Sequence, residues 1–527
     1  MRTKPSEIIA LQPWMLLLLA GALALGGCEL EATVNTPPDQ LDGMDQESEL
    51  DESAPDTLDL TEEQELYEQL DESDAVDLTP DAADRQDEYE DGDQAEQDLE
   101  PDELDQVEPE PDAPLLYPAA QVQSPLSPYV VQRLREIAAL SSAPQQDVFM
   151  KVGASGTVSS SFFYCLATSS VELDGRDELQ PCIDHFVAGN ANDGGVSGPL
   201  TPFDRPTYAA EVGRTAAWAM SGSPSPVERE REAINPRFAL VNYGTNDMNM
   251  GATYESALYP FYDNYTGLLD QVAAQGIIPV VTSILPRGDS SAADLWVPTY
   301  NAVIRGIAQT RQIPFVDYHL AVSTLPNRGL SGDGVHANAH PGSACRFDAE
   351  GLSYGYNMRN LITLEALDRT WRAVQFEEAS DETGIRIQGD GSKKGAFVIG
   401  ELPFAHAQDT RRSSNSDLDT YSGCNATQDE SGPEFYYDLQ LTVPTRLRML
   451  VLDSESADID LHLLGAEASA ESCRARAHRM IQGTLAAGRY TVVLDSWVNA
   501  SGEAQAGEYL FVVVECEAQD AACDPAL

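Results

Sequence analysis

Hydrophobic and polar positions follow one rhythm before Phe376 and another after it. In the first part, short β-branched apolar runs alternate with longer stretches in which apolar residues recur every three or four positions. The short runs predict strands at 147–152, 238–243, 277–284 and 313–316. The longer stretches predict helices at 130–140, 208–220, 254–275, 297–310 and 356–374. Strands that alternate with helices predict a parallel sheet with helices on both faces.

After Phe376 the chain has short alternating runs and no long helical pattern. These runs predict strands at 435–443, 446–453, 458–464, 488–495 and 508–515, separated by turn residues. Such spacing is typical of a β-sandwich. We therefore expect an α/β domain at 116–376, a linker rich in Gly and Asp at 377–396, and a small jelly-roll-like β-sandwich at 397–527.

The residues before the α/β domain have a different composition. Between Glu29 and Pro114 there are 35 Asp or Glu residues and one basic residue, Arg85. A segment this charged and this poor in aromatics cannot bury a core, which predicts a disordered acidic tether at 28–115. The chain as a whole carries a formal net charge of -56, so nucleic acid is not an expected partner because its phosphates would repel the protein.

The first residues combine a basic start, an apolar run from Trp14 to Leu25 and the sequence Leu25-Gly26-Gly27-Cys28. The run is shorter than the ~20 residues of a membrane-spanning helix. It resembles a bacterial lipoprotein signal peptide at 1–27, which implies cleavage before Cys28 and acylation of that residue. The lipidated Cys28 would then hold the protein on a membrane of the bacterial cell envelope. In such lipoproteins an Asp after the acylated cysteine is the signal for retention in the inner membrane, so the resemblance with Glu29 at this position implies the outer membrane or the cell surface. The alternative interpretation of residues 1–27 is an ordinary secretory signal.

Seven of the eight cysteines remain once Cys28 is set aside. An oxidising compartment favours disulfides, and an odd number leaves one thiol over. Proximity along the chain pairs Cys165 with Cys182, Cys424 with Cys473 and Cys516 with Cys523, and leaves Cys345, which could replace either member of the first pair. The chain has no Cys-x-x-Cys spacing, so we expect no metal site and no cofactor.

Three short motifs follow the predicted strands of the α/β domain: Gly153-Ala154-Ser155, Gly244-Thr245-Asn246-Asp247 and Asp333-Gly334-Val335-His336. Ligands of parallel sheets bind beyond the carboxyl ends of the strands, so these motifs are expected to converge there. A serine hydroxyl needs a base to remove its proton, and a histidine with an acid three residues earlier can serve as one. The motifs therefore predict a nucleophile Ser155, a base His336, an orienting acid Asp333 and an amide donor Asn246.

These residues resemble the SGNH, or GDSL-type, hydrolases over about 147–374. The resemblance implies a three-layer α/β/α, flavodoxin-like domain in which Ser155 attacks an ester carbonyl. It also implies an oxyanion hole made by the Ser155 amide, the Gly213 amide and the Asn246 side chain. Gly195 and Gly198 are rivals for the role of Gly213. The chain departs from the family pattern at Ala154, where Gly-Asp-Ser is usual.

Two other patterns compete with this interpretation. His340 lies four residues after His336 and could be the base, although no acid stands three residues before it. The sequence Gly351-Leu352-Ser353-Tyr354-Gly355 fits the nucleophile elbow of α/β-hydrolases, but no buried strand precedes it. The remaining histidines are interpreted as structural or surface residues: His185, His319, His406, His462 and His478.

Residues 458–463 and 487–492 resemble the bacterial pre-peptidase C-terminal domain. This resemblance implies either binding to a cell-surface polymer or a stabilising appendage. Asp458 and Asp460 could ligate calcium, or they could simply be solvated on an exposed strand.

The expected function is that of a lipid-anchored extracytoplasmic serine esterase that cleaves a carboxylic ester. Its partner would be a small-molecule or glycan ester with an O-acetyl or short acyl group. The alternative is a catalytically inactive surface lipoprotein that binds or adheres.

Overall fold

The computed structural model describes residues 114–527, except 169, 195–199, 377–379, 381 and 455. The predicted signal peptide, Cys28 and nearly all of the acidic tether lie outside the described residues. Within the described part, no helix is both long and apolar enough to cross a bilayer. The described residues belong to one compact unit.

The first part of this unit is built on a parallel sheet of four strands in the order β1-β2-β3-β4. The strands are β1 (Gln145–Gly153), β2 (Pro236–Asn242), β3 (Ile278–Thr282) and β4 (Phe315–Val316). Phe149 pairs with Phe238, which in turn pairs with Ile278. A single parallel bridge between Gly153 and Ala210 adds a short contact at the end of β1. All four predicted strands are therefore present.

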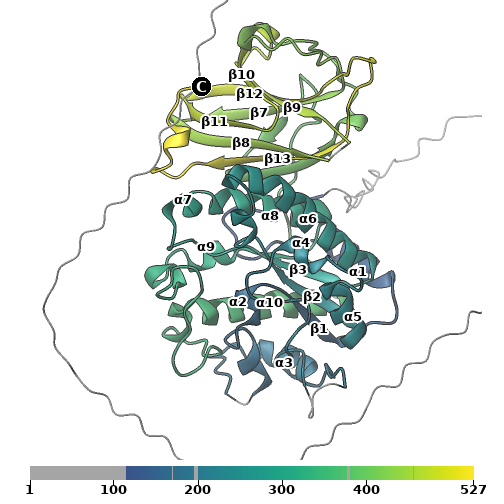
Figure 1. Ribbon diagram of the computed structural model, residues 1–527, viewed down its shortest axis with the longest axis vertical. Helices are drawn as coiled ribbons and strands as arrows, with labels where there is room; N and C mark the ends of the chain where they lie inside the picture. The colour runs from purple at the N-terminus through teal and green to yellow at the C-terminus, as the bar shows by residue number, and fades with distance from the viewer. Residues whose placement is uncertain (1–113, 169, 195–199, 377–379, 381, 455) are drawn as a thin grey trace, which may run out of the picture. The chain divides into compact units, whose positions relative to one another are not determined.

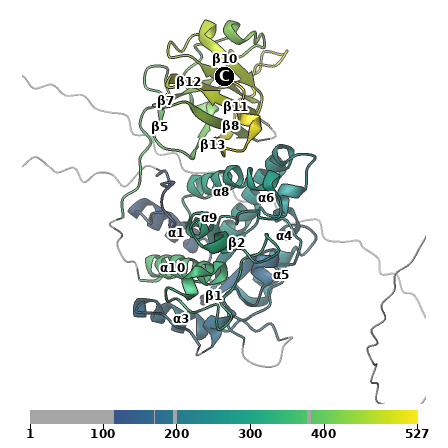
Figure 2. The same ribbon diagram turned by 90° about the vertical axis from the view of Figure 1, so that its left-hand side faces the viewer.

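Helices cover both faces of this sheet (Figures 1 and 2). One face carries α1 (Pro128–Ala139), α3 (Gln180–Val187) and α10 (Gly355–Gln375). The other carries α5 (Pro226–Ile234), α6 (Tyr254–Ala274) and α8 (Val297–Arg311). The shorter helices are α2 (Ser155–Val158), α4 (Ala216–Ala219), α7 (Ser291–Asp294) and α9 (Tyr318–Val322). The predicted three-layer α/β/α fold is confirmed.

The predicted helix at 208–220 is wrong over most of its length. Only α4 (Ala216–Ala219) is helical there, and the residues before it form turns. Their polar groups bond to neighbouring elements instead of to a helix: Thr207 Oγ1 donates to Lys151 O at 2.9 Å, and Tyr208 N donates to buried Glu230 at 2.9 Å. Gly213, with a φ of +78°, also breaks the helical path.

Two packed sheets form the second part of the unit, as expected of a β-sandwich. One has the order β10-β9-β12-β7-β5 and the other β11-β8-β13-β6. The neighbours are antiparallel except β5 and β7. The strands are β5 (Phe397–Ile399), β6 (Phe404–Asp409), β7 (Glu434–Leu441), β8 (Thr445–Asp453), β9 (Ile459–Leu464), β10 (Cys473–Ala477), β11 (Met480–Leu485), β12 (Gly488–Ser496) and β13 (Glu508–Glu515). The pattern had predicted β7, β8, β9, β12 and β13.

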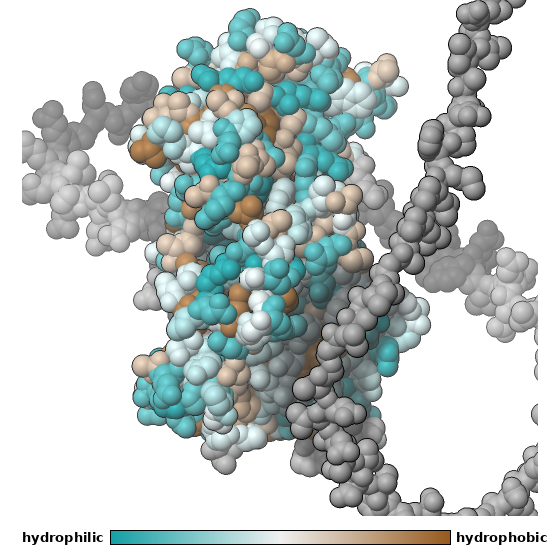
Figure 3. All heavy atoms as spheres, turned by 60° about the vertical axis from the view of Figure 1, so that its left-hand side comes forward, coloured by the Kyte–Doolittle hydropathy of each residue, from teal (hydrophilic) through white to brown (hydrophobic). Residues whose placement is uncertain are grey.

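Apolar side chains form a buried core in both parts. Strand β3 is buried along its whole length, as in a sheet covered on both faces. In the sandwich, Leu461 of β9 and Phe511 of β13 belong to one core between the sheets. On the face seen in Figure 3, hydrophobic side chains are scattered singly among hydrophilic ones.

The described residues form three disulfides, and one of them is the alternative that the sequence left open rather than the pairing by proximity. Cys165 binds Cys345 rather than Cys182, which is a free and buried thiol. Cys182 lies on α3 with its side chain in the core, so nearness in sequence did not bring it to Cys165. The other two bonds, Cys424–Cys473 and Cys516–Cys523, are as predicted.

Candidate active site

Ser155 lies where β1 ends and the one-turn helix α2 begins. The turn between them is tight, because a Cβ added to Gly153 would lie 2.3 Å from Thr157 Oγ1 and 2.8 Å from Asn242 O. Ala154 precedes the helix without any side-chain cap, and its carbonyl accepts from Thr157 N at 2.9 Å. The turn therefore closes without the aspartate that is usual in this motif, and Ser155 is left half-buried at the end of the sheet.

The predicted acid and base share a compact loop that Asp333 holds together. One carboxylate oxygen, Oδ1, accepts from Val335 N at 2.9 Å and from His336 N at 3.0 Å. Gly334 turns the chain with a φ of +71°, and a Cβ there would lie 2.6 Å from Asp289 N. Only glycine fits this position.

The three predicted catalytic side chains form a continuous line of hydrogen bonds. His336 Nε2 lies 2.8 Å from Ser155 Oγ, and His336 Nδ1 lies 2.6 Å from the second Asp333 oxygen, Oδ2. These bonds, and above all the one from His336, hold the pKa of Asp333 well below its usual range, so it is ionised and only accepts. Nδ1 must then carry the imidazole proton, and Nε2 presents a lone pair to the serine hydroxyl.

Asn246 lies beside this line, in the loop after β2. Its side-chain nitrogen donates to Arg214 O at 2.8 Å, which uses one of its two amide hydrogens. Buried Asp247 fixes the same loop, since its carboxylate accepts from Ala216 N at 2.9 Å and from Gly244 N at 3.0 Å. Asp247 thus connects the loop that carries Asn246 to the loop that carries Arg214, a role that the sequence motif did not indicate.

A narrow cleft brings the predicted residues together. It encloses about 510 Å³ including its open mouth. Ser155, Asn246 and His336 line it together with Arg214, whereas Gly213 is solvent-exposed and does not line it. The apolar part of the wall consists of Ala154, Tyr243, Leu285, Tyr318, Val335, Ala337 and Tyr356. The role of Gly213 in the oxyanion hole therefore stays a prediction. The two alternative glycines, Gly195 and Gly198, lie outside the described residues.

Two buried asparagines on α10 hold the loops behind the cleft. Asn360 Oδ1 accepts from Phe163 N at 3.1 Å, while its Nδ2 donates to Ser161 O at 2.9 Å and to Ala344 O at 3.0 Å. It therefore joins the segment that follows Ser155 to the segment that follows His336.

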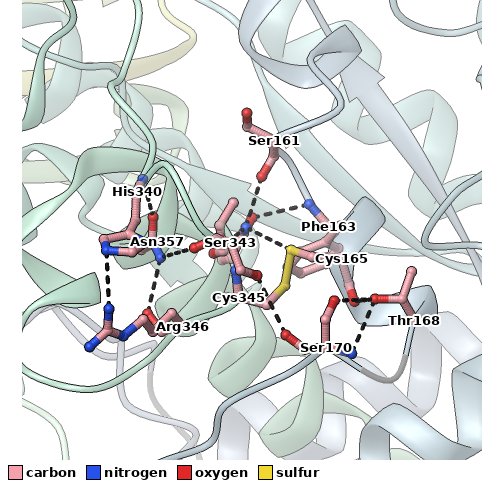
Figure 4. The surroundings of a disulfide bond; sticks show 12 residues. Ser161, Phe163, Cys165, Thr168, Ser170, His340, Ser343, Cys345, Arg346 and Asn357 are labelled. Carbon is pink, nitrogen blue, oxygen red and sulfur yellow. Dashed lines mark hydrogen bonds between the residues drawn. A yellow bond between two sulfur atoms is a disulfide. The ribbon is translucent and has the colours of Figure 1, made fainter.

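Asn357, one turn earlier, acts on the second segment alone. It accepts from His340 N and donates to Ser343 O and Arg346 O, as Figure 4 shows. The Cys165–Cys345 disulfide lies beside these bonds and joins the same two segments covalently. Neither asparagine stands out in the sequence, where the only signal is a pair of polar residues three positions apart on a predicted helix.

A third residue of α10, Arg359, supports the nucleophile helix directly. Its guanidinium is buried and donates to Gly156 O at 2.7 Å, and it lies 4.0 Å from the centre of the Phe162 ring. Burial lowers the pKa of Arg359. The side chain lines the floor of the cleft behind Ser155.

The competing patterns have other partners in the structure. His340 Nε2 lies 3.1 Å from Arg346 Nη1 and 3.5 Å from Glu350 Oε1, and its side chain is mostly buried. The residues of the alternative elbow form a short 3-10 turn, Gly351–Ser353, in which Ser353 Oγ donates to Glu350 O. No strand leads into that turn.

Comparison with known proteins places a family match on this region. Residues 187–341 match the model of the GDSL-like Lipase/Acylhydrolase family. The match contains Asn246, Asp333 and His336, and it begins after Ser155. No curated protein matches the chain.

Several solved structures were also found. A GDSL-like lipase from Bacteroides thetaiotaomicron is 18% identical, with 45% of this chain and 97% of that chain covered and a TM-score of 0.26. A carbohydrate esterase of family 3 from Talaromyces cellulolyticus is 20% identical, with 42% and 98% covered and a TM-score of 0.29. The pre-peptidase C-terminal domain of a Bacillus anthracis collagenase is 13% identical, with 22% and 91% covered and a TM-score of 0.15. The resemblance that the motifs indicate is confirmed over residues 187–341, which match the GDSL-like lipases and acylhydrolases.

Proposed function

We propose that this chain is a serine esterase that hydrolyses a carboxylic ester through Ser155, His336 and Asp333. The observation that carries the proposal is the line of two hydrogen bonds from Ser155 Oγ through the imidazole to a carboxylate held ionised by its loop. The GDSL-like family match supports the same class of reaction.

The bonds imply the direction of each proton transfer. Ser155 Oγ attacks the ester carbonyl carbon while its proton passes to His336 Nε2. The imidazolium that forms is stabilised by the Asp333 carboxylate at Nδ1. As the tetrahedral intermediate collapses, the carbon–oxygen bond to the leaving alcohol breaks and His336 returns the proton to that oxygen. Water then repeats the sequence on the acyl-serine and releases a carboxylic acid.

The negative charge that develops on the carbonyl oxygen needs donors that are already in place. We assign this role to the Ser155 amide and to the amide hydrogen of Asn246 that does not bond to Arg214. Asn246 is a neutral donor and needs no change of protonation. Asp247 and the loop around Arg214 keep it oriented.

The cleft favours a short acyl group on a small-molecule or glycan alcohol. Its walls are apolar near Leu285 and Val335 and polar near Asn246 and Arg214, which suits a short acyl group joined to a polar alcohol. A series of p-nitrophenyl esters checks this: acetate and butyrate should be hydrolysed with a higher kcat/KM than decanoate, and a preference for decanoate would contradict it.

Turnover of p-nitrophenyl acetate separates an esterase from an inactive binding protein. Ser155→Ala should lower kcat by at least about 10³-fold, because the nucleophile is lost. Ser353→Ala, in the alternative elbow, is the matched control and should keep the activity. Equal rates for the native chain and Ser155→Ala would leave only the binding alternative.

We also propose that the protein is a lipoprotein of the bacterial cell envelope, acylated at Cys28 and connected to its folded part by the acidic residues 28–115. The proposal rests on the signal-like sequence alone. The sandwich would then bind a cell-surface polymer and keep the esterase near its substrate.

A further inference from the structure

A segment of the sandwich folds back over the outer face of one sheet. Residues 413–433 connect β6 to β7, and Tyr421 and Leu418 of this segment pack on Leu464 of β9 and Val493 of β12. The Cys424–Cys473 disulfide fastens the segment to β10. We call residues 413–433 the covering segment.

Four carboxylates are buried beneath and beside the covering segment: Glu430, Glu434, Asp460 and Asp495, each with no solvent exposure. Among the described residues, Arg476 bonds to Asp460 and lies 3.8 Å from Glu430, and His478 Nδ1 lies 3.4 Å from Asp460 Oδ1. The carboxyl groups therefore outnumber the basic side chains that face them. Buried charges are costly unless a partner compensates them.

Three residues of this group, Glu430, His462 and Asp495, carry buried polar atoms that have no hydrogen-bond partner. Neither oxygen of Glu430 accepts a hydrogen bond, nor does Asp495 Oδ1, and neither ring nitrogen of His462 has a hydrogen-bond partner. All three residues are fully buried. Glu434 differs, because its Oε1 accepts from Tyr436 Oη at 2.6 Å and from Asp417 N at 2.7 Å. Buried polar atoms in folded proteins nearly always have partners.

Possible ligand atoms of the three residues lie close together. One ligand atom each of Glu430, His462 and Asp495 lies within 4.8 Å of the other two, and His462 Nε2 is 3.8 Å from Glu430 Oε1. These contacts are too long for hydrogen bonds, but the spacing leaves room for an ion that binds all three.

The strand register explains this convergence. Asp495 pairs with Asp460, and His462 pairs with Val493 two residues away on the same face of β9 and β12. Glu430 approaches from the covering segment. Tyr421 fixes two of the three side chains. Its ring stacks on that of His462, with the ring centres 3.6 Å apart, and its hydroxyl donates to Asp495 Oδ2 at 2.5 Å.

We propose that Glu430, His462 and Asp495 bind a divalent transition-metal ion of the zinc type. One imidazole nitrogen with two carboxylates is a ligand set of this class, whereas calcium prefers oxygen ligands alone. The ion would offset the excess negative charge and join the covering segment to β9 and β12. This revises the expectation of no metal, which came from sequence spacing.

Other groups in the described part of the sandwich are weaker candidates. Cys424 and Cys473, and likewise Cys516 and Cys523, are bonded to each other and are not free to bind an ion. Asp458, Asp460 and His478 also lie close together, but His478 is half-exposed and already bonds to Asp458 at 2.9 Å. The expectation that Asp460 is solvated is wrong, because it is fully buried.

Metal content and zinc titration test the proposal on the full chain after treatment with a chelator and dialysis. We expect about one equivalent of Zn²⁺ to bind. His462→Gln should lower the zinc affinity by at least about 10-fold, because losing a residue that only supports a metal ligand already costs about that much. His478→Gln is the matched control and should bind like the native chain. Zinc binding that is lost in the control but kept in His462→Gln would overturn the assignment, and so would binding of calcium with no binding of zinc.

A second variant keeps the test valid if His462→Gln does not fold. Glu430→Gln has the same shape but lacks an anionic oxygen to bind the ion, so it should keep the fold and lose zinc binding. Added Zn²⁺ should raise the melting temperature of the native chain and leave that of Glu430→Gln unchanged. An equal rise in both proteins, or no rise in the native chain, would contradict the proposal.

Discussion

Removing the Cys165–Cys345 disulfide should affect both stability and activity, and the other two disulfides provide controls. Cys165 and Cys345 lie 180 residues apart in sequence, while Cys424 and Cys473 lie 49 apart and Cys516 and Cys523 only 7. Each bond restricts the unfolded chain by closing a loop, and the restriction grows with the logarithm of loop length.

The loop lengths give an expected ranking. Loop-closure entropy predicts losses in the free energy of unfolding of about 5 kcal/mol for Cys165–Cys345, about 4 kcal/mol for Cys424–Cys473 and about 2 kcal/mol for Cys516–Cys523. Since a domain is stable by about 5–15 kcal/mol, the first loss is a large share of the total. The first bond also lies beside Asn360, which joins the loops behind Ser155 and His336.

Urea unfolding and p-nitrophenyl acetate turnover of the three double Cys→Ala variants measure these effects. We expect stability to fall in the order given, and kcat to fall only in the Cys165→Ala/Cys345→Ala variant at urea concentrations where it is still folded. Equal losses of stability in all three variants would refute the loop-length argument. Unchanged kcat in the first variant would refute the role of the bond in positioning the catalytic loops.

Three further predictions concern single residues. His336→Ala should abolish turnover while His340→Ala keeps most of it, because His340 bonds to Arg346 and not to Ser155; the reverse result in the p-nitrophenyl acetate assay would reassign the base. Burial raises the pKa of Asp247 to about 6, so the folded chain holds a proton that the unfolded chain loses between about pH 4 and pH 6. The free energy of unfolding should therefore fall as pH rises through that window, and urea unfolding of Asp247→Asn should show a smaller fall; an identical fall would count against this. Cys28→Ser should move the protein from the membrane to the soluble fraction of cells, and retention on the membrane would contradict acylation.

Periodicity predicted the regular parts of the fold well, because buried faces impose their spacing on the sequence. The strands that lead to Ser155 and Asn246 and the long helices α6, α8 and α10 appear within a few residues of the predicted bounds. The four edge strands β5, β6, β10 and β11 were missed, because strands at the edge of a sheet have a weaker pattern of buried residues than the central ones. The helix α5 was also missed, although Ser225-Pro226 with Glu228 is a capping box.

Features that depend on long-range packing could not be predicted. Nothing in the sequence near Cys165 indicates that Cys345, and not Cys182, lies beside it. The Ser155, His336 and Asp333 motifs were found because each carries a local turn with its own residue requirements. The group of Glu430, His462 and Asp495 has no local spacing, since one member comes from the covering segment and two come from neighbouring strands.

Covalent labelling of the nucleophile tests the central claim most directly. The full chain is treated with a p-nitrophenyl phosphonate, which transfers its phosphonyl group to an activated serine, and the modified peptide is identified by mass spectrometry. One phosphonyl group on Ser155, absent from Ser155→Ala and formed far more slowly in His336→Ala, is the predicted result. Labelling of another serine, or an unmodified Ser155 in a folded protein, would contradict it.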